Sequence, residues 1–234
     1  MNRLILIFFL LSPLSMQSHN ELCTIRKAGE NVYVSSQIDD HHEINYWFKK
    51  CMANDLFTFY RVSVTSGTTG TTVVNEAYSD NIGPFEIRGG GWCGGNHLFT
   101  DEKTQTAETF SIKLYADGQS ISSDTLLKAQ IIKLEVKNRI FNPLSAEQTG
   151  DKTYFTDTLC IENVNYTIRG NSIQVDLSHD YINRTPVIIT KYYGMQSMFK
   201  DENQLLTPLG KYPFWTNIHP VSYTHLTLPT TSRV

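Results

Sequence analysis

The sequence predicts an all-β fold, an antiparallel β-sandwich of the jelly-roll type. Apolar and polar residues alternate with a period of two in nearly every segment that has a clear pattern, which is typical of strands with one face on a core. Turn-forming dipeptides separate these segments, and no convincing amphipathic helix is longer than about two turns. Roughly eleven or more such segments, spaced about 10–15 residues apart, favour antiparallel sheets packed face to face.

The alternation can be followed along the chain. Between residues 31 and 35 it places Val32 and Val34 on one face, and later segments repeat the pattern with other apolar residues. The clearest predicted strands are 31–35, 56–64, 110–115, 132–137 and 173–178. Residues 43–53 are the best candidate for a helix, but their aromatic run suits a strand equally well.

Two turns support this assignment. Asp117-Gly118 fits a tight hairpin turn that requires positive φ angles. Gly170-Asn171 lies between segments 164–169 and 172–178, so these two segments are expected to pair. No internal repeat points to a propeller or a solenoid, and no Pro- or Ser-rich linker divides the middle of the chain. We therefore expect a single β-sandwich domain.

The two ends are expected to lie outside that domain, which would cover residues 19–220. Residues 1–18 begin with a positive charge and continue with an apolar run too short to span a bilayer, as in a cleaved signal peptide. Residues 221–234 resemble a translated sequencing-adapter tail, so they are expected to be non-native and to follow a truncation near Pro220. The sequence thus predicts a secreted or periplasmic bacterial protein with no membrane insertion after signal cleavage.

Composition and net charge argue against several classes of protein. The 234-residue chain has a net charge of −3 and is 12% aromatic, which argues against disorder and against a nucleic-acid partner. In an exported chain, the four cysteines either form two disulfides or remain buried thiols, and the sequence does not separate these alternatives. They are Cys23, Cys51, Cys93 and Cys160. Their spacing is not that of a zinc site, so neither a metal nor a cofactor is expected.

The most unusual segment is 80–97, which holds six of the 14 glycines within Gly83–Gly95. Because glycine is entropically costly to order, its use here suggests tight turns or a close approach of the main chain to another group. The segment also carries an indole, an amide, an imidazole and a guanidinium, in Trp92, Asn96, His97 and Arg88. It is either a recognition or catalytic loop or a surface loop whose Trp92 covers an edge of the core.

A second candidate is the strand end at residues 190–196. Alternation places Lys191 and Tyr193 on one side and Tyr192 on the other, before Gly194 bends the chain. There are two alternatives for this strand end. Either both tyrosines pack in the core, or a tyrosine, Lys191 and Gln196 lie side by side and form a strand-end site. His179 continues an apolar strand face, where a hydrogen-bonded core or rim histidine is favoured over a catalytic one. Residues 39–42 offer carboxylates and imidazoles, in either a solvated loop or a metal site.

These residues suit a protein that handles glycans. In a polysaccharide lyase, His97 and Tyr193 would act as base and acid while Arg88, Asn96 or Gln196 neutralise the uronate carboxylate. Trp92, Tyr192, Lys191 and Gln196 are the expected substrate-binding residues. The alternative is a non-catalytic carbohydrate-binding or surface adhesion module, and the second alternative is a structural domain. All of these expectations require residues 80–97 to lie beside residues 188–196. Catalysis is favoured if His97 and Tyr193 meet within about 6 Å in a cleft, and binding if the rings form a platform.

Overall fold

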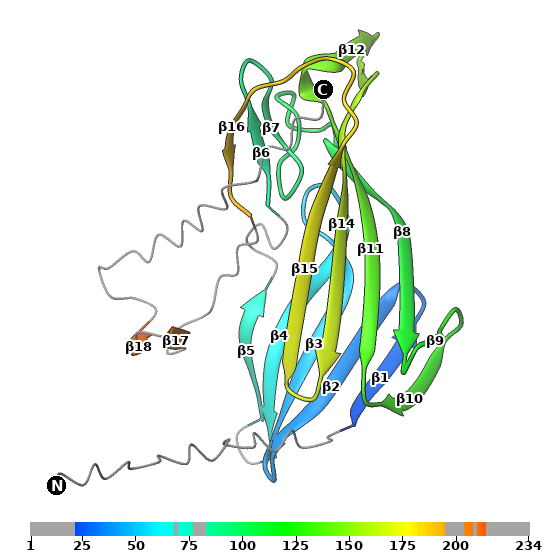
Figure 1. Ribbon diagram of the computed structural model, residues 1–234, viewed down its shortest axis with the longest axis vertical. Coiled ribbons are helices and arrows are strands. Elements are labelled where there is room, and N and C mark those ends of the chain that lie inside the picture. The colour runs from blue at the N-terminus through cyan, green and yellow to red at the C-terminus, as the bar shows by residue number, and fades with distance from the viewer. Residues whose placement is uncertain (1–21, 68–69, 77–82, 195–203, 208–209, 214–234) are drawn as a thin grey trace, which may run out of the picture.

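The computed structural model describes residues 22–67, 70–76, 83–194, 204–207 and 210–213. Two large antiparallel sheets lie face to face (Figure 1). The first has the order β10-β1-β2-β3-β4-β5, and the second has the order β15-β14-β11-β8-β9. The strands of the first sheet are β1 (Cys23–Ala28), β2 (Asn31–Asp39), β3 (His42–Cys51), β4 (Leu56–Ser66), β5 (Gly70–Glu76) and β10 (Thr125–Ala129). The strands of the second are β8 (Ala107–Ala116), β9 (Gln119–Ser120), β11 (Ile132–Phe141), β14 (Thr158–Arg169) and β15 (Ser172–Tyr181).

Smaller elements cover one end of the two sheets, the upper end in Figure 1. A three-stranded sheet there has the order β16-β6-β7, beside a short 3-10 helix and a hairpin. Its strands are β6 (Phe85–Ile87), β7 (Gly91–Cys93) and β16 (Ile189–Tyr192). The helix is η1 (Pro143–Ser145), and the hairpin consists of β12 (Ala146–Thr149) and β13 (Lys152–Phe155). A separate hairpin, which is not part of this group, joins β17 (Gln204–Thr207) and β18 (Gly210–Pro213).

The core lies between the two large sheets, where the alternating apolar residues of both meet. Phe48 on β3 and Tyr166 on β14 are both buried, and their rings meet edge to face with centroids 5.2 Å apart. The Tyr166 hydroxyl lies 3.0 Å from the Thr58 hydroxyl of β4, so the polar atom of this core residue is also satisfied. These contacts join the sheets into one sandwich, which confirms the predicted all-β antiparallel β-sandwich.

The jelly-roll connectivity is not confirmed. A jelly roll is built from Greek keys, in which long connections carry the chain between distant strands. Here β1 to β5 follow one another as antiparallel neighbours in a single sheet. Short turns cause this order, because a turn such as Gly29-Glu30 returns the chain directly to the adjacent strand.

The local predictions agree with the structure. Residues 43–53 form a strand rather than a helix, since most of them belong to β3, which pairs with β2 on one side and β4 on the other. Asp117 and Gly118 have φ angles of 47° and 81°, and they join β8 to β9 as the hairpin prediction requires. The predicted hairpin around Gly170 is also present, because Arg169 pairs with Ser172 between β14 and β15.

Three predictions fall outside the described residues. They are the signal peptide at 1–18, the non-native tail at 221–234 and the site residue Gln196. Within the part of the chain that the structure describes, no helix is long and apolar enough to cross a membrane.

All four cysteines are buried free thiols. Burial raises the pKa of Cys51 and of Cys93 to about 12, and it also raises the pKa of Cys23 and Cys160. Because the thiolate is the reactive form, we expect the folded protein to resist alkylation. A maleimide reagent followed by mass spectrometry should label four thiols in urea and almost none in buffer. Rapid labelling of the folded chain, or a mass lower by the hydrogens lost to disulfides, would contradict this prediction.

Candidate functional site

The Gly-rich segment folds into a hairpin beside the strand end, as expected. Phe85 of β6 pairs with Cys93 of β7 on one side and with Tyr192 of β16 on the other. Glycine is required where the two segments touch, since a Cβ atom on Gly83 would clash with the backbone of Gly194. We call this end of the molecule, formed by β6, β7, β16 and the chain up to His97, the rim (Figure 1).

Asn54, in the turn between β3 and β4, holds the last part of the rim in place. Its side-chain nitrogen lies 3.2, 2.9 and 2.9 Å from the carbonyl oxygens of Gly94, Gly95 and His97. Its side-chain oxygen accepts a hydrogen bond of 2.8 Å from the backbone N–H of Thr106. Asn54 is almost completely buried. The sequence analysis missed it, because an isolated Asn in a turn gives no signal of contacts some 40 residues away.

Two aromatic side chains and one ammonium group of the rim gather around Trp92. The His97 ring stacks on the indole with centroids 5.0 Å apart and planes 18° apart. The Tyr193 ring also lies 5.0 Å from Trp92, tilted by 35°, and the Lys191 ammonium lies 5.6 Å from the indole centroid. The structure thus brings four of the predicted site residues together, with His97 and Tyr193 each packed on the indole.

Two charged side chains of the rim, Glu86 and Lys191, compensate each other. Lys191 Nζ lies 3.1 Å from a carboxylate oxygen of Glu86, and the Thr190 hydroxyl donates to the same oxygen at 2.8 Å. The hydrogen bond from Thr190, followed by that from Lys191, lowers the pKa of Glu86. The hydrogen bond to Glu86 in turn raises the pKa of Lys191. Both groups are therefore held in their charged forms as partners of each other.

The other predicted site residues do not join the ring cluster as active groups. The Asn96 side-chain oxygen accepts a hydrogen bond of 2.7 Å from the backbone N–H of Ala53. Arg88 is exposed, and its backbone N–H bonds to Ile188. Tyr192 points to the interior and stacks on Phe85 at 4.7 Å. Of the two alternatives for this strand end, Tyr192 follows the core-packing one, whereas Tyr193 is 42% exposed on the rim.

A buried polar network lies beneath the rim. His179 Nε2 of β15 lies 3.1 Å from Glu162 Oε2 of β14, and the Asn138 amide of β11 donates to Glu162 Oε1 at 2.9 Å. Asn138 Oδ1 accepts from the Thr109 hydroxyl at 2.6 Å. Glu162 and Asn138 are fully buried, and the side chain of His179 is 12% exposed. His179 is thus the hydrogen-bonded histidine that the sequence analysis favoured.

The Asp39–His42 segment forms a turn. The Asp39 carboxylate accepts hydrogen bonds from the backbone N–H groups of His41 and His42 and from the His42 ring. The backbone bond from His41, followed by the bond from the His42 ring, lowers the pKa of Asp39. Among the described residues, no group of three or more His, Cys, Asp or Glu is placed to hold a metal ion.

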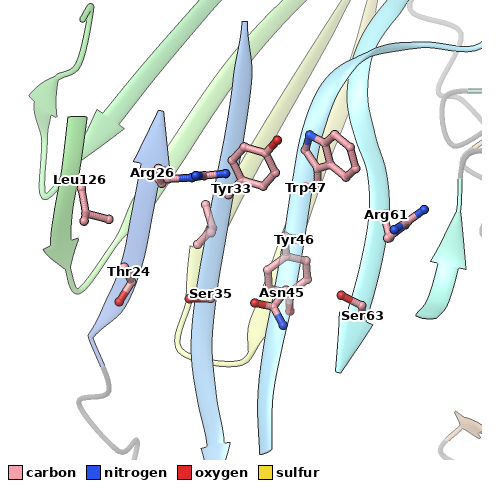
Figure 2. A pocket seen from close by; sticks show the side chains of 11 residues that line it. Thr24, Arg26, Tyr33, Ser35, Asn45, Tyr46, Trp47, Arg61, Ser63 and Leu126 are labelled. Atoms are coloured by element: carbon pink, nitrogen blue, oxygen red, sulfur yellow. The ribbon is translucent and has the colours of Figure 1, made fainter. Parts of the chain in front are cut away.

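A second surface, which the sequence analysis did not single out, lies on the outer face of the six-stranded sheet. Side chains from neighbouring strands are in register there and form two adjacent rows across β1 to β4 (Figure 2). One row consists of large side chains, those of Arg26, Tyr33, Trp47 and Arg61. The other is small and polar, with Thr24, Ser35, Asn45 and Ser63. Together they line a shallow pocket of about 360 Å³, which we call the sheet groove.

The rings above the sheet groove are held by one another and by cations. Tyr33 stacks on Trp47 with centroids 5.3 Å apart, and Tyr60 meets Trp47 edge to face at 4.8 Å. The Arg26 guanidinium lies 4.4 Å from the Tyr33 centroid, and the Lys49 ammonium lies 3.8 Å from that of Tyr60. A further hydrogen bond of 3.0 Å runs from the Trp47 indole to Asn31.

The signal for this surface was present in the sequence, in the outward positions of the strands. Tyr33 and Ser35 flank the inward Val34, and Asn45 and Trp47 flank the inward Tyr46. Period-2 alternation predicts that each pair faces outward, but it gives no register between strands.

Comparisons of this chain with protein-family models, curated proteins and solved structures return no significant match.

Proposed function

We propose that this protein is a non-catalytic glycan-binding module, exported from the cell, that holds a polysaccharide chain in the sheet groove. The observation that carries the proposal is the register of the two rows across β1 to β4, which sets an aromatic wall beside a polar floor. Glycans present apolar C–H groups and closely spaced hydroxyls, so they need both kinds of surface at once.

The floor of the groove suits hydroxyl groups. Thr24 and Ser35 are partly exposed and offer hydroxyl groups that both donate and accept hydrogen bonds. Asn45 is also partly exposed, and it offers its amide oxygen, because its amide nitrogen donates to the Glu43 carbonyl and the Thr65 hydroxyl. Side chains this short leave room above the sheet, whereas the neighbouring row of rings and guanidinium groups rises beside them. The resulting pocket is shallow and open, as a site for a polymer must be if the chain is to enter and leave along its length.

The rim supports the catalytic alternative less well. Elimination by a lyase requires a base beside the proton α to the uronate carboxylate and an acid beside the glycosidic oxygen that leaves from the neighbouring carbon. In the rim, His97 and Tyr193 instead pack their rings on Trp92, and Glu86 and Lys191 neutralise each other. The Asn96 oxygen is engaged by Ala53 rather than directed at a ligand. These contacts favour a binding module over a polysaccharide lyase.

Replacing Trp47 with alanine is expected to weaken glycan binding at least about tenfold, because a ring in the centre of the wall is lost. Affinity electrophoresis of the folded domain in gels containing soluble polysaccharides would measure the change. Trp92→Ala, which removes the equivalent ring from the rim, is the matched control and should bind as the parent protein does.

Three results would contradict the proposal. They are no retardation by any of a panel of neutral and acidic polysaccharides, equal binding by Trp47→Ala, or loss of binding only in Trp92→Ala. Release of an unsaturated product from a polyuronate, followed by its ultraviolet absorbance, would restore the lyase alternative. Thermal unfolding of each variant would separate loss of the site from loss of the fold.

A further inference from the structure

We propose that the sheet groove selects acidic polysaccharides over neutral ones, with Arg26 and Lys49 as the groups that bind the ligand's anionic substituents. This inference rests on the proposed glycan-binding function and adds the ligand's charge to it. It is carried by the placement of the cations on this face and by the charges that surround them.

The sheet groove is cationic. Arg26 belongs to its eleven lining residues, which contain no Asp or Glu (Figure 2). Arg61 also lines the groove but stands opposite Glu76 of β5 in the strand register, whereas Arg26 stands between Leu126 and Tyr33. The Lys49 ammonium lies just beyond them, 4.8 Å from the Trp47 centroid and 3.8 Å from that of Tyr60. The chain as a whole carries a net charge of −3, so a cationic groove is a local feature and not a consequence of composition.

Neighbouring lysines on the same strands show a different arrangement. Lys27 of β1 pairs with Asp124 at 3.7 Å, and Lys50 of β3 pairs with Glu30 at 3.8 Å. Arg26 is adjacent to Lys27 in the sequence, and Lys49 is adjacent to Lys50. Within the described part of the chain, neither Arg26 nor Lys49 forms an ion pair with a carboxylate. Their charges lie over aromatic rings instead. A ring attracts a cation without neutralising it, so both groups keep their charge available to an anionic ligand.

The rings also position these cations in advance. A long side chain loses rotamer entropy when it is fixed on a ligand, and a cation that already rests on a ring has lost part of that entropy before binding. Arg26 projects from β1 toward Tyr33 of β2 (Figure 2), so its planar group is held beside the polar floor. A guanidinium in that position suits the two oxygens of a carboxylate or the three of a sulfate ester.

The register sets the direction of the ligand. The two rows cross the four strands β1 to β4. The first and the last of these strands are three inter-strand spacings, or about 14 Å, apart. A polysaccharide chain is therefore expected to run across the strands, with its hydroxyls over Ser35 and Asn45 and an acidic group at Arg26. This length accommodates a short run of sugar units rather than a single one.

A single-stranded nucleic acid also combines negative charge with apolar surface, but the rings of this face suit it poorly. Bases bind by stacking on open aromatic faces. Tyr33 and Trp47 stack on each other, Arg26 covers Tyr33, and Lys49 covers Tyr60. A base needs one whole open ring face, whereas the C–H groups of a sugar can also pack against ring edges, so this arrangement favours a glycan over base stacking.

The test compares a polyuronate with its methyl ester, because the two share one backbone and differ only in the charge of each unit. The parent protein is expected to bind the polyuronate at least about tenfold more tightly than the ester, and Arg26→Gln should lose most of that preference. Lys27→Gln is the matched control, since Lys27 is the adjacent residue and is already paired with Asp124. Raising the salt concentration should weaken polyuronate binding only.

Each outcome decides between the two proposals. Equal affinity for the polyuronate and its ester would overturn the acidic selectivity and leave glycan binding intact. A preference that survives Arg26→Gln would overturn the assignment of Arg26 as a group that binds the acidic substituent. Binding to neither polymer nor any other glycan would overturn both. A sulfated polysaccharide in parallel shows which anionic group is preferred, and tighter binding of a single-stranded oligonucleotide than of either acidic glycan would overturn the inference in favour of nucleic acid.

Discussion

Replacing His179 with alanine is expected to lower the free energy of unfolding by about 3–5 kcal/mol. His179 is the side chain on β15 that bonds to the fully buried carboxylate of Glu162. Without it, one carboxylate oxygen stays in the interior with no partner from that strand, and Asn138 satisfies only the other oxygen. The alanine also removes a ring that packs against Phe85 at 5.1 Å and Tyr192 at 5.3 Å, so the rim loses part of its support. Urea denaturation monitored by fluorescence would measure the loss.

A second variant separates the charge from the packing. In the double variant His179→Phe with Glu162→Met, the buried charge is removed, but the buried Asn138 amide loses its acceptor, so only part of the stability is expected to return. Ser178→Ala is the matched control, since Ser178 is the neighbouring residue of β15, is exposed and is expected to change stability by less than about 0.5 kcal/mol. If His179→Ala were as stable as Ser178→Ala, the network beneath the rim would have no role in the fold.

Asn54→Ala is expected to destabilise the protein by at least about 3 kcal/mol. The substitution removes the donor to the Gly95 carbonyl and leaves the Thr106 N–H without its acceptor, whereas the carbonyls of Gly94 and His97 keep a second donor. Each buried polar group left without a partner costs about 1–3 kcal/mol. The effect should be concentrated at residues 94–97, which Asn54 ties to the turn between β3 and β4. Hydrogen exchange should therefore accelerate there much more than in β11.

Asn96→Ala is the control for Asn54→Ala, because the Asn96 side-chain oxygen accepts a hydrogen bond from the same turn, at the backbone N–H of Ala53. It should cost about 1 kcal/mol and change hydrogen exchange little. Polysaccharide binding in the sheet groove should persist in both variants wherever they remain folded. Uniform acceleration of exchange across both large sheets would show instead that Asn54 contributes to global stability alone.

Much of the local structure could be predicted because it depends on neighbours in sequence. Alternation alone indicates that Val32 and Val34 face the core, and positive φ angles at Asp117 and Gly118 follow from the chemistry of a tight turn. The close approach of the Gly-rich segment to the strand end was also predictable, since glycine is needed where another backbone crosses, as Gly194 crosses Gly83. The roles of Asn96 and Tyr192 were not, because each depends on a partner from another element.

Antiparallel sheets with one apolar face each follow from the order of the residues, because side-chain alternation and turn residues act over a few positions. The register, in contrast, is visible only in the folded protein, where it places Arg26 beside Tyr33, Trp47 beside Arg61 and Glu162 beside His179. Cross-strand contact depends on how strands far apart in the sequence align, and alternation with a period of two leaves that alignment open. Both the sheet groove and the buried network arise from that alignment.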